Sequence, residues 1–233
     1  MTGLNYNMGN SKLLIAIDGP AGVGKTSVGK ALASKYGLGF LSTGIMYRCL
    51  GWKALKSGVN LQDEEAVFKI AKNIVWGFEK EADSNLRVLV DGQFLGDALI
   101  SEEVGRAASI TSALPKARAV ITDKQKALAA EGGLVMEGRD IGTVIAPNAN
   151  LKFYMVASAE ARAKRRVLQL KEKGQEADYE EILKSIISRD ERDSSRKTAP
   201  LKPATDAILI DTSALTLEEV INKVLELSRT NAS

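Results

Sequence analysis

The chain has 233 residues, 45% of them hydrophobic and 26% charged, so it can bury a core and is too apolar to be disordered throughout. A total of 32 Lys and Arg residues against 29 Asp and Glu residues gives a net charge of +3, too small to argue for nucleic-acid binding. The single Cys excludes an intramolecular disulfide and a Cys-rich zinc site. There is no His, which excludes mechanisms that need a His base or a His-ligated metal.

The beginning of the chain carries no targeting signal. Residues 1–11 are polar and lack the apolar stretch of a signal peptide. No apolar run approaches the roughly 18 residues that a membrane-spanning helix needs. We therefore expect a soluble cytoplasmic protein without a membrane partner, in which residues 1–11 form a flexible extension.

The first half of the chain predicts a buried strand, several helices and then an antiparallel segment. Residues 13–17 are an uninterrupted apolar run, typical of a strand that is buried on both faces. A second strand is expected to end at Ser42. Helices are expected at 25–36, 45–57 and 62–72, and short strands at 74–78, 86–90 and 93–95. Because Asp91-Gly92 is a strong hairpin signal, we expect residues 60–105 to form a small antiparallel insert.

The second half returns to an alternation of strands and helices. Strands are expected at 134–136, 151–156 and 207–210, and helices at 115–130, 158–172, 178–193 and 217–228. Buried strands that alternate with helices predict an α/β fold, with a mostly parallel sheet covered by helices on both faces.

The turn after the first strand is a phosphate-binding motif. Its sequence, Gly19-Pro20-Ala21-Gly22-Val23-Gly24-Lys25-Thr26, matches the Gly-x4-Gly-Lys-Thr pattern between a predicted strand and a predicted helix. Backbone N–H groups of this loop and of Ser27 would surround the phosphates of ATP or GTP, Lys25 would reach the β- and γ-phosphates, and Thr26 would ligate Mg²⁺. The chain has no Asn-Lys-x-Asp motif of the kind that G proteins use to select guanine, which leaves ATPases and kinases.

Three further stretches carry polar residues that a purely structural role would not need. They are residues 42–48, residues 137–143 after a predicted strand, and residues 189–196. Polar groups at the carboxyl end of a parallel strand face the ligand crevice of an open sheet. Taken singly, each stretch also fits a simpler interpretation: a capped helix with a surface Arg, a glycine turn with surface charges, or a charged helix end.

Taken together and in this order, these stretches resemble bacterial cytidylate kinases, and the resemblance extends from residue 13 to about residue 227. It rests on Ile-Asp-Gly-Pro-Ala-Gly-Val-Gly-Lys-Thr at 17–26, Thr-Gly-Ile-Met-Tyr-Arg at 43–48, Glu-Gly-Arg-Asp-Ile-Gly-Thr-Val at 137–144, Arg-Asp-x-Arg-Asp at 189–193 and Ala-Pro-Leu at 199–201. The resemblance implies a P-loop kinase core at 12–59 and 106–233. It also implies a nucleoside-monophosphate-binding insert at 60–105 and a helical lid at 158–176.

The resemblance further implies an activity: transfer of the γ-phosphoryl group of ATP to CMP or dCMP, with Mg²⁺, by a monomer that needs no nucleic acid. An acceptor phosphate is already ionised at neutral pH, so its oxygen can attack without a base, and the missing His is then no obstacle. Two alternatives stay open. One is another small-molecule P-loop kinase, such as a shikimate-type kinase, and the other is a regulatory or nucleic-acid-stimulated NTPase.

Site residues follow from the same resemblance. Arg48, Arg139 and Arg196 are expected at the acceptor phosphate, and Arg189 and Asp193 at the sugar. Asp140, Ser109 and Arg118 are expected at the base, while Thr43 and Tyr47 line the nucleotide pocket, although Tyr47 fits a half-buried core position equally well. The spacing of Arg162, Arg165 and Arg166 predicts one helix face, which related kinases use in a lid over the ATP phosphates. Lys25, Arg139, Arg162 and Arg166 are the expected catalytic residues.

The sequence departs from the family pattern at two positions. Family members often carry Asp where this chain has Ser42, and Asp again where it has Glu137. Glu137 could still act on Mg²⁺ through water, but its side chain is longer than that of Asp, so Thr26 is the one residue that we assign to the metal.

Overall fold

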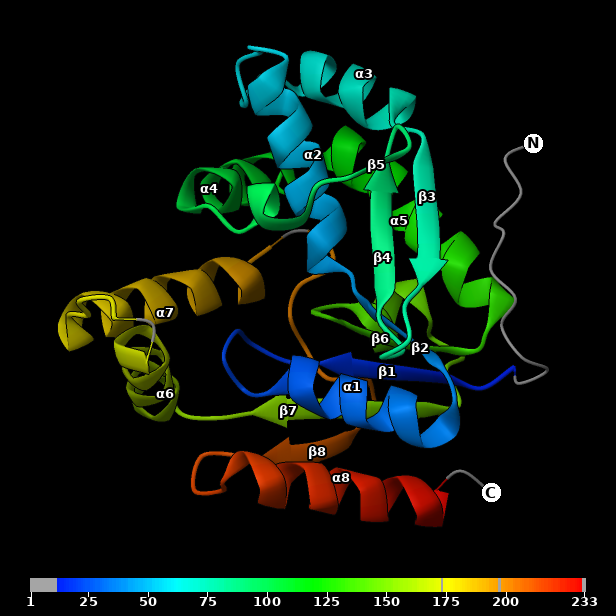
Figure 1. Ribbon diagram of the computed structural model, residues 1–233, viewed down its shortest axis with the longest axis vertical. Helices are drawn as coiled ribbons and strands as arrows, with labels where there is room; N and C mark the ends of the chain where they lie inside the picture. The colour runs from blue at the N-terminus through cyan, green and yellow to red at the C-terminus, as the bar shows by residue number, and fades with distance from the viewer. Residues whose placement is uncertain (1–11, 173, 197, 232–233) are drawn as a thin grey trace.

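The computed structural model describes residues 12–172, 174–196 and 198–231 (Figure 1). Its main sheet has five parallel strands in the order β2-β6-β1-β7-β8. These strands are β1 (Leu14–Asp18), β2 (Gly39–Ser42), β6 (Leu134–Gly138), β7 (Leu151–Val156) and β8 (Ile208–Asp211). The expected α/β class with a mostly parallel sheet is confirmed. The expected extension at residues 1–11 lies outside the described residues, as does residue 173 of the predicted lid.

The two faces of the sheet bury two separate hydrophobic cores, because successive side chains of a strand point to opposite faces. Leu14 and Ala16 of β1 join one core, and Ile15 and Ile17 join the other. Helices α1 (Lys25–Tyr36) and α8 (Leu217–Asn231) cover the second face; Figure 1 draws α1 in front of the sheet and α8 below it. Helices α2 (Gly44–Lys56), α3 (Glu64–Asn73) and α5 (Pro115–Glu131) pack on the first core.

The antiparallel segment forms a second sheet, as expected. Strands β3 (Trp76–Lys80), β4 (Leu86–Val90) and β5 (Gln93–Phe94) pair in chain order. Asp91 and Gly92 have φ values of 52° and 78°, which is the left-handed backbone that a two-residue hairpin turn needs. A bridge between Phe40 and Asn85 joins this sheet to β2.

Three elements were not expected from the sequence. A 3₁₀ helix η1 (Gly96–Leu99) leads into helix α4 (Glu102–Thr111), which crosses the expected insert boundary at residue 105. Helix α4 packs closely on α2 at Gly51, where a Cβ atom would lie 2.6 Å from the backbone nitrogen of Ala108. The division into core and insert stays a prediction.

The third unexpected element is the π-helix η2 (Ile141–Ile145), shortly after β6. Each of its hydrogen bonds joins residues five positions apart. The N–H of Ile145 donates to the carbonyl oxygen of Asp140 at 3.1 Å, and that of Ala146 donates to the carbonyl oxygen of Ile141 at 2.7 Å. Single π-turns of this kind are rare and concentrate at functional sites. The π-turn sets the path of the chain immediately after the Arg139-Asp140 pair.

Helices α6 (Ala159–Glu172) and α7 (Tyr179–Ser194) pack on each other and project from the left of the molecule in Figure 1. Both helices were expected at close to these bounds. Among the helices that the structure describes, none combines the length and the apolar character that a membrane span needs.

Candidate active site

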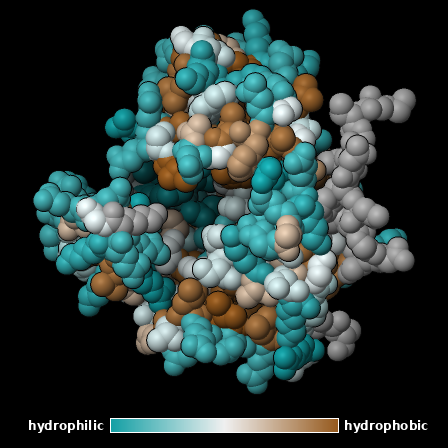
Figure 2. Space-filling view, in the orientation of Figure 1, coloured by the Kyte–Doolittle hydropathy of each residue, from teal (hydrophilic) through white to brown (hydrophobic). Residues whose placement is uncertain are grey.

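A large pocket opens at the carboxyl ends of the parallel strands. Its volume is about 1190 Å³, and in the space-filling view hydrophilic residues surround the recess between the α6–α7 region and the upper part of the molecule (Figure 2). Lys and Arg residues outnumber acidic residues in its walls: the cations are Lys25, Arg48, Arg106, Arg118, Arg139, Arg165, Arg189, Arg192 and Arg196, and the acids are Glu102, Glu137, Asp140 and Glu172. Such a wall favours ligands with several negative charges.

The glycine-rich loop between β1 and α1 forms one side of the pocket. Gly19, Gly22 and Gly24 have φ values of 145°, 81° and 94°, which other residues rarely adopt. A Cβ atom at Gly19 would overlap the carbonyl oxygen of Met155 on β7. Lys25 at the start of α1 donates to the carbonyl oxygens of Gly19 and Pro20 at 2.8 and 2.6 Å. The loop therefore curls around this ammonium group, with the helix N-terminus aimed at the pocket.

Lys25 is only 7% exposed, so its charge is costly. Burial, followed by the nearby positive charge of Arg139, lowers the pKa of this side chain to about 7. An anion bound beside the ammonium would offset this cost, because opposite charges at close range stabilise the charged form. The electrostatics of Lys25 therefore favour an anionic ligand.

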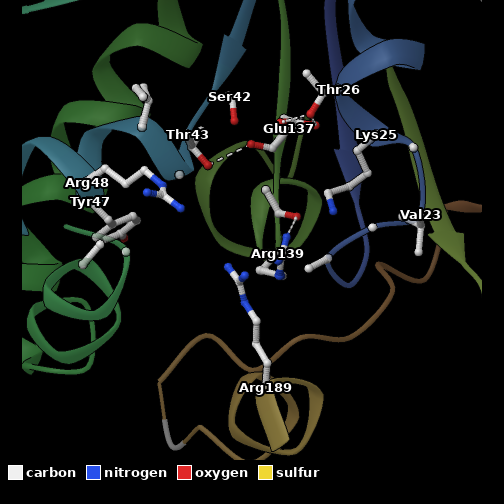
Figure 3. A pocket seen from close by; sticks show the side chains of 18 of the residues that line it. Val23, Lys25, Thr26, Ser42, Thr43, Tyr47, Arg48, Glu137, Arg139 and Arg189 are labelled. Atoms are coloured by element: carbon white, nitrogen blue, oxygen red, sulfur yellow. Dashed lines mark hydrogen bonds between the residues drawn. The ribbon is translucent and has the colours of Figure 1, made fainter. Parts of the chain in front are cut away.

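The carboxylate of Glu137 lies beside the loop. Glu137 on β6 accepts a hydrogen bond from the hydroxyl of Thr26 through Oε1 at 2.9 Å and Oε2 at 3.2 Å (Figure 3). A hydroxyl and a carboxylate are oxygen ligands of the kind that Mg²⁺ prefers, so these residues fit that ion. Among the described residues there is no group of three or more acidic, His or Cys side chains that could hold a metal ion. Water and nucleotide phosphates would therefore complete the coordination.

Arginine side chains gather on the opposite side. Arg48 of α2 donates to the carbonyl oxygen of Leu99 at 2.7 Å, and Arg139 donates to Oδ2 of Asp193 at 2.9 Å. Arg196 donates to the other oxygen of the same buried Asp193. Arg189 projects from α7 toward Arg139 (Figure 3). Asp193 therefore orients two arginines that face the cavity.

Arg118 and Asp140 form a buried pair deeper on this side. Arg118 on α5 donates to Oδ2 of Asp140 at 2.7 Å, and their side chains are 6% and 8% exposed. The guanidinium of Arg118 also lies 5.4 Å from the ring centre of Tyr47, within the range of a cation–π contact. A charged donor and a charged acceptor thus lie side by side at the pocket wall, an arrangement suited to a flat ligand with both donors and acceptors.

The three arginines of α6 do not behave alike. Arg162 is buried and donates to the carbonyl oxygen of Ala21 at 3.2 Å and to Oδ1 of Asp190 at 3.1 Å. Arg165 lines the pocket and donates to Thr212 and Leu215 in the segment after β8. Arg166 is exposed and does not line the pocket. The expected common face therefore brings two of the three arginines to the site region.

Most of the residues expected at the site share the pocket wall: Ala21, Gly22, Val23, Gly24, Lys25, Thr26, Ser27, Thr43, Tyr47, Arg48, Ser109, Arg118, Arg139, Asp140, Arg165, Arg189 and Arg196. Four other expected residues do not line the pocket but contact residues that do. Gly19 and Pro20 accept from Lys25, Arg162 contacts Ala21, and Asp193 contacts Arg139.

Comparison with known proteins agrees with this arrangement. A family model described as cytidylate kinase matches residues 15–230. The chain belongs to the cytidylate kinase family. The cytidylate kinase of Caldanaerobacter subterraneus subsp. tengcongensis is 42% identical over 222 residues, covering 95% of this chain and 97% of that protein. The cytidylate kinase of Caldicellulosiruptor saccharolyticus is 44% identical, covering 93% and 95%, and that of Pseudomonas paraeruginosa is 43% identical, covering 91% and 93%.

Several pocket residues of this cytidylate kinase family member had no assigned role. Arg106 lines the cavity, as do Ser42, Glu137 and Arg192 from the three polar stretches. The sequence holds a signal for the two arginines, since Arg192 follows Arg189 by three positions and Arg106 precedes Ser109 by three, so each pair shares a helix face. Glu137, whose part in Mg²⁺ binding the sequence leaves open, accepts from the hydroxyl of Thr26.

Proposed function

We propose that this protein transfers the γ-phosphoryl group of ATP to CMP or dCMP, giving ADP and CDP or dCDP. One observation carries the proposal: a phosphate-binding loop, a group of arginines and a buried Arg118–Asp140 pair face a single cavity. An acceptor phosphate oxygen attacks the γ-phosphorus as the bond to the β–γ bridging oxygen breaks, and ADP leaves with that electron pair. The acceptor oxygen is already an anion, so no base has to remove a proton.

The donor phosphates belong at the glycine-rich loop. Lys25 neutralises the β- and γ-phosphates, and backbone N–H groups of the loop donate to their oxygens. Arg162 and Arg165 flank the loop from α6, and Arg162 can exchange its contact with Asp190 for one with a phosphate. Mg²⁺, held with ATP by Thr26 and Glu137, supplies charge neutralisation at the phosphates when it is bound. The predicted role of Arg166 stays a prediction.

The acceptor belongs on the arginine-rich side. Arg48, Arg139 and Arg196 bind its phosphate, and Arg189 and Asp193 hold its sugar. Two polyanions repel each other, so several cations must lie between the donor and the acceptor for the reacting atoms to meet. Arg139 suits this position because Asp193 orients it and it lies near enough to Lys25 to affect its pKa.

The base is recognised by the buried pair. Cytosine presents an amino donor at N4 and acceptors at N3 and O2. Asp140 and Ser109 accept from the amino group, and Arg118 donates to N3 and O2. Uracil has a carbonyl where cytosine has its amino group, so UMP would leave the Asp140 carboxylate without its donor and is selected against.

The activity test measures ADP release with ATP and a panel of CMP, dCMP, UMP, AMP, GMP and shikimate. We expect CMP and dCMP to give the highest kcat/KM. Equal ADP release with and without CMP would refute the proposal, and a preference for shikimate would favour the other small-molecule kinase. Monomeric state, cytoplasmic location and independence from nucleic acid stay predictions, and the net charge of +3 supports only the last of them.

A further inference from the structure

Asp18 is a buried carboxylate that the proposed reaction leaves without a role. It is the last residue of β1, directly before Gly19 of the phosphate-binding loop, and it is 4% exposed. Its carboxylate does not contact Lys25 through a hydrogen bond. Instead, Oδ1 accepts from the backbone N–H of Ile141 at 2.8 Å and Oδ2 accepts from that of Gly142 at 2.7 Å.

These two N–H groups open the π-helix that follows Arg139 and Asp140. The first N–H groups of a helix have no partner within the helix, so a carboxylate that accepts both fixes where and in which direction the helix begins. β1 and β6 pair up to Asp18 and Gly138, and the chain then leaves the sheet for two residues before Ile141 and Gly142 donate to Asp18. Arg139 and Asp140 thus lie on a short segment that is fixed at both ends.

Ionisable groups from three other elements lie near this carboxylate. Asp140 after β6 and Lys25 of α1 act on it electrostatically, and it acts in turn on Tyr154 of β7. The side chain of Lys152 on β7 also lies near Gly142. Burial raises the pKa of Asp18 to about 6, so the ionised form is less stable here than in water.

We propose that Asp18 is a positioning residue for acceptor binding: through Ile141 and Gly142 it holds Arg139 and Asp140 in register with the phosphate-binding loop. The inference rests on the proposed CMP kinase activity. It predicts that damage at Asp18 appears mainly in the use of CMP, although Asp18 lies next in sequence to the ATP loop.

The test compares Asp18→Asn with wild type in steady-state kinetics and thermal unfolding. An Asn side chain keeps one acceptor oxygen but presents an N–H₂ group to the second backbone N–H, so one hydrogen bond is lost. We expect the KM for CMP to rise by roughly tenfold or more, the KM for ATP to stay within about twofold, and Tm at pH 8 to be unchanged or higher. Asp63→Asn is the matched control, because Asp63 also accepts from a backbone N–H at the start of a helix, α3, but is exposed. This variant should leave both KM values unchanged.

The substitution Gly142→Ala adds a methyl group beside the same contact and keeps the charge of Asp18. A Cβ atom there would lie 3.2 Å from Cδ of Lys152, so that side chain must give way slightly, and 3.4 Å from Oδ2 of Asp18, at the near limit of ordinary contact. We expect a smaller rise in the CMP KM, and this variant decides the question if Asp18→Asn does not fold. Unchanged CMP kinetics, or equal losses for CMP and ATP with a lowered Tm, overturn the proposal. A wild-type protein that does not phosphorylate CMP is a separate result, which overturns the proposed function instead.

Discussion

The hydroxyl of Thr26 donates to the carboxylate of Glu137 at 2.9 Å, although the two residues lie 111 positions apart in the chain. The strand register places Glu137 opposite Ser42, so the carboxylate has a short neutral neighbour on β2. The carboxylate of Glu137 therefore reaches the residue expected to hold Mg²⁺.

Glu137→Gln tests whether this carboxylate takes part in metal binding. The variant keeps the size of the side chain and removes its charge, so we expect the Mg²⁺ concentration for half-maximal activity to rise by about tenfold. Binding of Mn²⁺ to the ADP complex, followed by electron paramagnetic resonance, should weaken in parallel. Glu79→Gln on the exposed part of β3 is the control and should change neither value. Equal Mg²⁺ dependence in both variants would remove Glu137 from the metal site.

Lys25→Ala removes the ammonium group around which the loop folds. We expect kcat to fall by about 100-fold or more, because a charge that opposes the developing negative charge of the transition state is lost. The far-ultraviolet circular dichroism spectrum should stay that of wild type. Lys30→Ala lies on the same helix, where Lys30 makes only an exposed 3.9 Å contact with Asp83, and its kcat should be unchanged. Wild-type turnover of Lys25→Ala would contradict the role assigned to it.

Asp140→Asn tests recognition of the base. The substitution removes the buried negative charge beside Arg118 and offers a donor where cytosine also presents one. We expect the KM for CMP to rise by roughly tenfold or more, the ratio of kcat/KM for CMP to that for UMP to fall, and the KM for ATP to stay constant. An unchanged ratio would place Asp140 outside the base site.

The free energy of unfolding should depend on pH through Asp18. Its folded pKa is raised from an ordinary value of 3.8 to about 6, so between these values the folded state binds more protons than the unfolded state. Stability contributed by this group therefore falls as pH rises from about 4 to 6, by up to roughly 3 kcal/mol. Asp18→Asn should remove this component. The difference is measured by urea unfolding of both proteins at about pH 4.5 and about pH 7, which cover most of the titration of Asp18. An identical pH dependence would show that Asp18 does not titrate as described.

Gly29→Ala tests the packing of α1 on the sheet. A Cβ atom at Gly29 would overlap the ring of Phe40 on β2, which is 4% exposed, so we expect a loss of about 1–3 kcal/mol in the free energy of unfolding. Gly44→Ala is the matched control, since a Cβ atom at the start of α2 has no heavy atom within 4 Å, and its stability should be unchanged or slightly higher. Chemical denaturation measures both. Equal stability of the two variants would show that the ring moves aside at no cost.

Local patterns in the sequence predicted most of the fold. The apolar run at β1, the hairpin at Asp91-Gly92 and the helices α1 and α5 all appear as expected, with a left-handed Gly37 after α1 and Pro115 at the start of α5. Each depends on a few neighbouring residues. Helix α4 also carries local signals, because Ser101 caps it and two acidic residues follow, but its first residues, 102–105, fall in the expected antiparallel insert.

Long-range contacts explain what the sequence could not predict. The π-helix begins where Asp18 accepts two N–H groups, and that contact spans more than 120 positions. The role of Glu137 depends on the register of β2, β6 and the loop before α1. Helical spacing predicts one face for Arg162, Arg165 and Arg166. The neighbouring segments decide which part of that face is covered, and Arg166 lies outside the covered part.

Asp190 and Asp193 lie three positions apart near the end of α7, and each contacts an arginine that we propose for a different substrate. Asp190 accepts from Arg162 beside the glycine-rich loop, and Asp193 accepts from Arg139 on the arginine-rich side. Less than one turn of helix therefore connects the two halves of the proposed reaction. A tilt of α7 would move both contacts together, so under the proposed roles the release of ADP and the release of the phosphorylated pyrimidine nucleotide would be linked.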